Sequence, residues 1–321
     1  MAQLMAGLAE GMNPGNPVAD LLLGWQGDPS SRADSVPLRL AGGLHALVLT
    51  GQDPDLAAAY ALPDADPTGA ALAALARHQN FLLDWLESPP QTNEVRRSAV
   101  LIAAAHWLTA RSGLPLVLSE LGASAGLNLL WDHYALAVSG QRLGPADAIL
   151  TLAPDWTGPL PPTPRPKVIA RAGVDLNPLD PVTDRLRLLA YLWADQPDRL
   201  TRTRAALDLA ATTRPTVTRG DAAGWLEARL RTRHQGAIHL VFHTVAWQYF
   251  QPDTAARARA ALVRAGADAT PDAPLARLGM ETDPSGPGAA VTLTLWPSGE
   301  VLPLGRADFH GRWIDWASPQ P

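Results

Sequence analysis

The stretch LPLVLSELGASAGLNLLWDHY, residues 114–134, places a short apolar run before a glycine-rich turn and a second apolar segment. The run at 115–121 has the length and composition of a buried strand. Gly122 and Gly126 allow a tight turn, and residues 125–136 are expected to form the helix that follows it. A strand, a glycine turn and a helix in this order predict the first unit of a parallel sheet covered by helices.

The chain before this stretch has a different pattern. Apolar residues recur there at intervals of three and four, which predicts helices, and Thr92 is expected to cap the helix that ends at Gly113. We therefore expect a helical N-terminal region over residues 1–113. Residues 114–321 are expected to form a doubly wound, mostly parallel α/β domain of the Rossmann type, with a seven-stranded sheet and an antiparallel C-terminal hairpin.

The later strands of this domain are expected where short apolar runs end at polar residues. The second, third and fourth strands end at Asp175, Asp221 and His243, and PLARLGME, residues 274–281, supplies the fifth. The segment AILTLAPDW is ambiguous and is interpreted as an inserted hairpin strand. These strand ends are the positions at which a doubly wound sheet holds its ligands.

Composition excludes several classes of function. The chain of 321 residues has a formal charge of −5 and no run of Lys or Arg, which argues against binding to nucleic acid or to an anionic membrane. It has no cysteine, so disulfides, thiolate metal sites and cysteine nucleophiles are excluded. His239 and His243 have no third ligand nearby, and no metal is expected. Without a signal peptide or a long apolar segment, a cytoplasmic location is expected. The oligomeric state is left open.

The turn GASAG fits the G-x-S-x-G elbow of serine hydrolases, with Ser124 as nucleophile. An acid and a histidine must then follow, and the candidates are Asp221 or Asp283 with His310, or Asp221 with His243. The elbow of that fold lies on a central strand with several strands before it, whereas the residues before 114 are predicted to be helical. The serine hydrolase is therefore the less favoured interpretation.

A second interpretation starts from Glu120, which the first strand delivers at its carboxyl end just before the glycines. A helix N-terminus after such a turn can hold a nucleoside cofactor. A carboxylate this close disfavours a pyrophosphate and favours a cationic or neutral ligand. S-adenosylmethionine, which carries an ammonium and a sulfonium, fits this chemistry better than a dinucleotide.

The pattern Glu-x-Gly-x-x-x-Gly after a first strand resembles motif I of the Rossmann-like, class I methyltransferases. This resemblance implies that Asp175 contacts the ribose hydroxyls of S-adenosylmethionine and that Asp221 contacts its adenine. More narrowly, ELGASAGLNL, GVDLNPLD, DRLRLLAYLWADQ and VFHTVAWQYF resemble the uncharacterised bacterial family called domain of unknown function 2332. That resemblance spans nearly the whole chain and implies a fold and a cofactor pocket, without a known reaction.

The expected cofactor-binding residues follow from this resemblance: Glu120, Gly122, Ala123, Ser124, Gly126, Asn128, Asp175, Leu176, Asp221 and Ala222. Two departures from the methyltransferase pattern stand out. Ser124 replaces the usual middle glycine, and the interval from Glu120 to Asp175 far exceeds the roughly 20 residues of a tight βαβ unit. An insertion is therefore expected between them, with Asp155 as the rival ribose acid.

His243 and Tyr249 are the candidate catalytic residues, because they follow the fourth strand at the edge where a transferred group would lie. His243 is expected to act as general base, with Tyr249 or Gln248 orienting the acceptor. The alternative is a buried, structural histidine. We expect the protein to bind S-adenosylmethionine and to transfer its methyl group to a small-molecule acceptor of unknown identity. A non-catalytic binding or interaction protein is the alternative.

Overall fold

The computed structural model describes residues 1–30, 33–62 and 66–321. The described residues divide into two compact units, Met1–Thr92 with Val182–Arg204, and Asn93–Pro181 with Ala205–Pro321. The sequence predicts a domain boundary after Gly113. Compact units are not the same as independently folding domains, so this boundary stays a prediction. Within the described ranges, no helix combines the length and the apolar character needed to cross a membrane.

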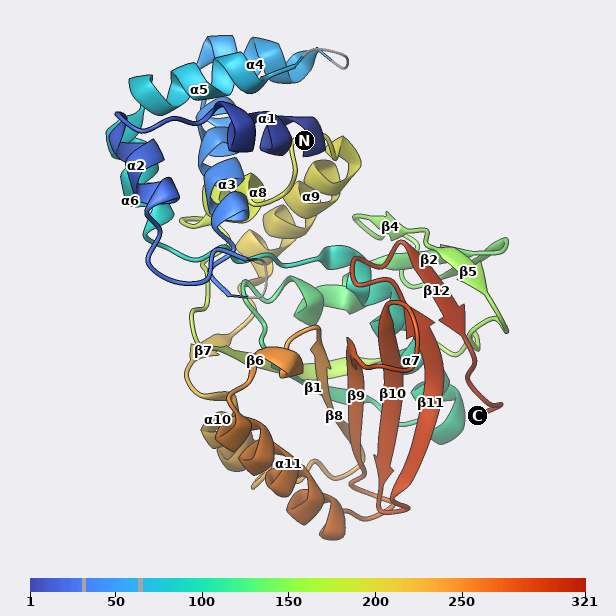
Figure 1. Ribbon diagram of the computed structural model, residues 1–321. Helices are drawn as coiled ribbons and strands as arrows, with labels where there is room; N and C mark the ends of the chain where they lie inside the picture. The colour runs from blue at the N-terminus through green and yellow to red at the C-terminus, as the bar shows by residue number, and fades with distance from the viewer. Residues whose placement is uncertain (31–32, 63–65) are drawn as a thin grey trace. The chain divides into compact units, whose positions relative to one another are not determined.

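The described residues of the first unit form helices and the turns between them (Figure 1). The helices are α1 (Ala2–Gly11), α2 (Pro17–Leu23), α3 (Val36–Leu49), α4 (Pro54–Ala61), α5 (Thr68–Arg77), α6 (Gln79–Leu86), α8 (Arg185–Ala190) and the first part of α9 (Pro197–Thr213). Leu40, Leu44 and Leu47 recur on one face of α3 and are buried in the core of this unit. The expected helical N-terminal part is thus confirmed.

The start of the next helix differs from the expectation. Thr92 was expected to cap it, but α7 (Ser98–Ser112) begins six residues later, after the 3₁₀ turn η1 (Val95–Arg97). The side chain of Glu94 accepts a hydrogen bond from the backbone N–H of Arg96 and so caps η1. At its other end α7 stops at Gly113, as expected, in a left-handed conformation.

The second unit is organised by one sheet with the strand order β5-β12-β11-β10-β9-β8-β1-β6-β7 (Figure 1). Its strands are β1 (Leu116–Leu121), β5 (Asp155–Thr157), β6 (Val168–Asp175), β7 (Val217–Arg219), β8 (Ile238–Thr244), β9 (Leu275–Thr282), β10 (Ala289–Trp296), β11 (Glu300–Ala307) and β12 (Trp313–Trp316). In this order the neighbours β7, β6, β1, β8 and β9 pair in parallel. The neighbours β9, β10, β11 and β12 pair in antiparallel fashion.

This sheet confirms the α/β fold class, its mostly parallel part and its antiparallel C-terminal stretch. It has nine strands in place of the expected seven. The two additional strands, β12 and β5, are short and lie at the edge beyond β11. Strands are predicted from apolar runs of several residues. Edge strands of three or four residues are too short to show such a run, so the sequence did not predict them.

The connection that follows β1 also differs from the expectation. In place of a helix over 125–136, the chain forms the 3₁₀ segment η2 (Leu127–His133) and then β2 (Ala135–Val138). The backbone bends at Leu130, and the Tyr134 hydroxyl donates to the Leu127 carbonyl. Strand β2 pairs with β3 (Gln141–Leu143) and β4 (Thr151–Leu152), so the expected insertion forms a small sheet of its own.

Helices α10 (Ala222–Arg229) and α11 (Pro252–Ala267) pack beside each other against one face of the large sheet (Figure 1). They contribute Leu226 and Leu262 to a core that includes Leu121 of β1 and Val241 of β8. This core fixes the two central strands whose carboxyl ends carry the candidate site.

Two neighbouring residues of α11 test this packing. Leu262 is 1% exposed, whereas Val263 is 57% exposed. Leu262→Ala is expected to lower the free energy of unfolding by about 2–5 kcal/mol, because it removes buried methyl groups and leaves a cavity. Val263→Ala is expected to change it by less than about 0.5 kcal/mol. Urea unfolding followed by circular dichroism measures both, and equal losses would contradict the assigned faces of α11.

Candidate functional site

The candidate site lies where the direction of winding reverses in the parallel part of the sheet. From β1 the chain proceeds to β6 and β7 on one side, and to β8 and β9 on the other. In such sheets the connections after the two central strands leave in opposite directions, and the crevice at their carboxyl ends holds the ligand. Here those strands are β1, which ends with Glu120 and Leu121, and β8, which ends with His243 and Thr244.

The turn after β1 is built from residues in left-handed conformations. Gly122, Ser124 and Gly126 have φ values of +74°, +52° and +72°. A Cβ on Gly122 would come within 2.6 Å of the Cβ of Ala246, in the turn after β8. Both the backbone conformation and the close approach therefore require glycine at this position. Ser124 adopts a strained conformation, as functional turns often do.

Most of the N–H groups of this turn already donate to acceptors in the protein. Gly122 and Ala123 donate to the Val174 carbonyl, Gly126 donates to the Ala123 carbonyl, and Ser124 donates to the Asp175 carboxylate. A phosphate group needs such N–H groups for itself. The turn is therefore better suited to a ligand without phosphate.

Glu120 is the most unusual ionisable residue at the carboxyl ends of these two strands, β1 and β8. Its side chain is 2% exposed, and among the described residues its Oε2 has no hydrogen-bond partner. Burial and the nearby Asp175 raise the pKa of Glu120 well above its ordinary value, and Arg97 lowers it by less. Such a carboxyl is either protonated or satisfied by a cation, so the site favours a cationic ligand.

Asp175, at the end of β6, lies beside the turn as expected. Its two carboxylate oxygens accept from the N–H groups of Ser124 and Asn177, both at 2.8 Å. The next residue, Leu176, is 75% exposed. The rival acid, Asp155, lies in β5, which five strands separate from β1. Of the two candidates, only Asp175 is brought to the glycine turn.

Asn128, one of the expected cofactor-binding residues, helps to hold the region of this turn in place. It is 3% exposed, and its Oδ1 accepts from the Ser98 hydroxyl at 2.7 Å. Asn93 reinforces the same region, because its side-chain amide donates to the Ala123 carbonyl at 2.8 Å. Both contacts tie the turn to the residues that lead into and begin α7, which should keep its conformation fixed.

Asp221 and Ala222 occupy the start of α10. The Asp221 carboxylate caps this helix by accepting from the Gly224 N–H at 2.8 Å, and it also accepts from the Thr254 hydroxyl at 2.8 Å. Burial alone would raise the pKa of Asp221, but these hydrogen bonds and Arg257 outweigh it, and the pKa is lowered. The structure thus gives Asp221 a structural task, while its contact with an adenine stays a prediction.

His243 is fully buried at the end of β8, and both of its ring nitrogens have partners. Nδ1 lies 2.7 Å from Glu281, and Nε2 accepts from the Arg277 Nε–H at 3.1 Å. The ring is therefore neutral, with its proton on Nδ1, consistent with a pKa lowered mainly by burial. In this arrangement Nε2 has no lone pair left for a substrate. These contacts are the ones that a structural histidine requires. To act as a general base, His243 would first have to release Arg277.

Glu281 is a residue of this region that the sequence did not indicate. Its Oε1 accepts from His243 and from the N–H groups of Ala246 and Trp247, and so holds the turn after β8. The only available signal was its position at the carboxyl end of the fifth strand, beside the fourth. In the same turn Val245 has φ +53°, which is strained for a β-branched residue.

Tyr249 belongs to the 3₁₀ turn η3 (Trp247–Tyr249), and its side chain is 65% exposed. The Trp247 ring packs against both His243 and Arg277, and the ring centroids of Trp247 and His243 are 4.9 Å apart. Tyr249 and Leu176 thus present exposed apolar surface, while His243 is withdrawn from solvent. Of the two candidate catalytic residues, only Tyr249 is accessible.

One catalytic pair that the sequence suggested is not assembled. The proposed pair Asp221 and His243 is not formed, because each side chain is held by other partners, Thr254 and Glu281 respectively. No group of three metal-ligating side chains occurs in the part of the chain that the structure describes.

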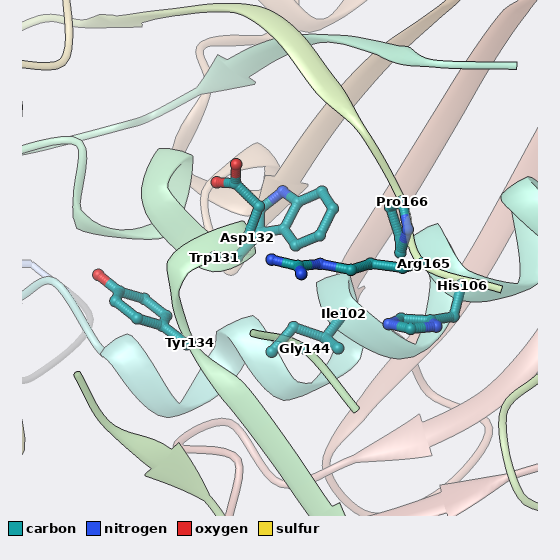
Figure 2. Close-up of a pocket in the computed structure, with 8 residues that line it drawn as sticks. All are labelled: Ile102, His106, Trp131, Asp132, Tyr134, Gly144, Arg165 and Pro166. Atoms are coloured by element: carbon teal, nitrogen blue, oxygen red, sulfur yellow. The ribbon is translucent and has the colours of Figure 1, made fainter. Parts of the chain in front are cut away.

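Two cavities lie away from the glycine turn. One, of about 10 Å³, has room for about one water and is lined by residues that include His106, Trp131 and Arg165 (Figure 2). Trp131, which follows the glycine turn in η2, thus lines this small cavity and not the crevice beside Glu120. The other, of about 240 Å³, lies between η2 and the segment before β7.

Comparison with known proteins gives one match. The family described as "Uncharacterized protein conserved in bacteria (DUF2332)" matches residues 1–316. No curated protein and no solved structure matches the chain.

The raised pKa of Glu120 has a consequence for stability that Glu120→Gln tests without ligand. Well below pH 4.5, the carboxyl at this position is protonated in both folded and unfolded wild type. At higher pH the unfolded chain ionises first, so wild type loses up to about 1.4 kcal/mol per pH unit until the folded carboxyl ionises. The variant is spared this loss, and its advantage should grow as the pH rises above 4.5.

Chemical unfolding at several pH values measures this difference. The matched control is Glu10→Gln, on the exposed face of α1, which is expected to follow the wild-type profile. A stability difference between Glu120→Gln and wild type that stays constant with pH would show that Glu120 titrates normally in the folded protein.

Proposed function

Since the chain belongs to the DUF2332 family, whose description assigns no activity, we propose a function from the site itself: the protein binds S-adenosylmethionine and methylates a small-molecule acceptor. The observation that carries this proposal is the buried Glu120 carboxylate with an unpartnered oxygen at the point where the sheet reverses. A ligand that brings positive charge to this position stabilises the ionised carboxylate.

The chemistry of the turn supports this cofactor class. The N–H groups that a pyrophosphate would need are already used within the protein, which argues against a dinucleotide. S-adenosylmethionine has no phosphate, and it carries positive charge on its ammonium and sulfonium groups. A buried acid and a closed glycine turn are compatible with such a ligand.

We assign the binding roles as follows. Glu120 accepts a hydrogen bond from the cofactor ammonium, either directly or through a group of the glycine turn. Asp175 accepts from the ribose hydroxyls, for which its oxygens would have to share or release the N–H groups of Ser124 and Asn177. The exposed Leu176 covers the adenine ring, and Asp221 with Ala222 contacts its edge. The remaining residues of the turn, Gly122 to Gly126 and Asn128, shape the pocket floor.

The cofactor would supply an activated methyl group together with its leaving group, so the protein's task is to hold the acceptor in line. Tyr249 is exposed beside the crevice and can orient such an acceptor through its hydroxyl. His243 can assist as base only after releasing Arg277. An acceptor that is already nucleophilic, such as a thiolate or an amine, would need no such base.

Binding without methyl transfer is the second candidate, and the engagement of both His243 nitrogens favours it. Turnover over a panel of thiol, amine and hydroxyl acceptors separates the two candidates. The serine hydrolase retains the strained Ser124 as support, since elbow nucleophiles lie on such turns. Labelling of Ser124 by a fluorophosphonate would establish it, and no labelling of folded protein would exclude it.

Calorimetric titration with S-adenosylhomocysteine tests the binding proposal. Saturable binding is expected in wild type, with affinity at least about tenfold weaker in Glu120→Gln and Asp175→Asn, because each loses a charge-assisted contact. Asp221→Ala should weaken binding only if its adenine contact exists.

Glu10→Gln is the matched control, because it removes an exposed carboxylate from α1 and should bind as wild type does. Thermal unfolding confirms that each variant is folded. No binding by folded wild type at millimolar ligand would refute the cofactor proposal and leave the methyltransferase resemblance as one of fold.

A further inference from the structure

We propose that the cavity of about 240 Å³ in the second unit is a binding site for the oxyanion group of a small molecule. It lies between the end of η2, strand β6 and the segment that joins α9 to β7. It is separate from the crevice around Glu120 and does not depend on the function proposed for that crevice.

The residues that line the cavity are basic, hydroxyl-bearing or apolar, and none is acidic. His133, Arg171 and Arg214 supply nitrogen donors, and Thr216 adds a hydroxyl. Over the whole chain, acidic residues outnumber Lys and Arg by 31 to 26. No carboxylate belongs to the lining. Asp132 and Asp180 each pair with one of the arginines from outside it, and the donors that remain suit this concave surface to an anion.

Arg171 is a fixed donor in this cavity. Its guanidinium forms a bidentate ion pair with Asp132, at 2.7 and 2.9 Å, and its Nη1 also donates to the Leu129 carbonyl at 2.7 Å. These contacts leave its Nε–H and one Nη2–H without an acceptor among the described residues. Because Asp132 holds the guanidinium in place, little side-chain entropy is lost when a ligand accepts from these groups.

Arg214 occupies a position that usually requires glycine. It follows the last residue of α9 with φ +48°, and its N–H donates to the Ala210 carbonyl at 2.9 Å. Its side chain contacts Asp180 through one nitrogen, Nη1, at 3.0 Å. The other guanidinium N–H groups remain available to a ligand. The chain thus keeps a strained arginine at the mouth of the cavity, which supports a role in binding.

The size of the cavity restricts the ligand. A volume of about 240 Å³ lies just below the usual range of about 300–1,000 Å³ for ligand pockets. It accommodates one phosphate or carboxylate group with a few carbon atoms, which can contact Leu130 and Pro215. The ligand class is therefore a small phosphorylated or carboxylated molecule.

Titration with inorganic phosphate, followed by calorimetry at constant ionic strength, tests this site. Wild type is expected to bind with a dissociation constant on the order of 1 mM. Arg214→Ala and His133→Ala are each expected to weaken binding about tenfold. Arg233→Ala removes an exposed arginine outside the cavity and is expected to leave binding unchanged. Thermal unfolding identifies folded variants, and His133→Ala suffices if Arg214→Ala does not fold.

A parallel titration with acetate identifies the oxyanion. Binding of phosphate alone assigns the site to phosphorylated ligands, and binding of acetate with the same response to the two variants assigns it to carboxylates. The proposal is overturned if phosphate does not saturate, if all variants bind equally, or if chloride competes as well as either probe. None of these outcomes affects the titration with S-adenosylhomocysteine.

Discussion

The turns that follow β1 and β8 approach so closely that no side chain fits between Gly122 and Ala246. This contact depends on two features, the left-handed backbone of the first turn and the grip of the Glu281 carboxylate on the second. Together they determine where Glu120, Ser124 and Tyr249 lie. The candidate crevice is therefore shaped by backbone geometry before any side-chain chemistry is considered.

Two buried carboxyls of this region illustrate how surroundings determine charge. Glu281 accepts from three donors, and its pKa is lowered although burial alone would raise it. Glu120 has an unpartnered oxygen, and its pKa is raised by burial and by Asp175. The three donors to Oε1 offset the burial of Glu281, although its Oε2 is also unpartnered among the described residues. No such donors offset the burial of Glu120, which is the physical reason for placing a ligand beside it.

Sequence pattern located the parts of the fold that long apolar runs encode. The strands that end at Leu121, Asp175 and Thr244 lie within a residue or two of their expected positions. The first and the last are continuous buried runs, whereas the strand that ends at Asp175 is buried only in part. The helix expected at 125–136 is replaced by η2 and β2. The apolar residues of this segment can be buried as well by these two elements as by a helix, so their pattern does not distinguish the two. The short edge strands β5 and β12 carried too little pattern to be foreseen.

The candidate site was predictable to the same extent. Residues that share one turn, such as Gly122 and Ser124, could be grouped from the glycine pattern and the resemblance it carries. The partners of His243 could not be found in this way, because Glu281 and Arg277 lie on the neighbouring strand and become close only through strand register. Asp221 shows the converse limit, since an acid before a helix fits a cap and a ligand contact equally well.

The pairing of β5 with β12 joins residues 155–157 to residues 313–315. Such a pairing across much of the chain forms late in folding, because a large loop must be closed first. Until then β12 presents unpaired backbone groups at the edge of the sheet, where another chain could add a strand. The insertion that separates Glu120 from Asp175 thus has a second consequence: it supplies the short strand that shields this edge from self-association.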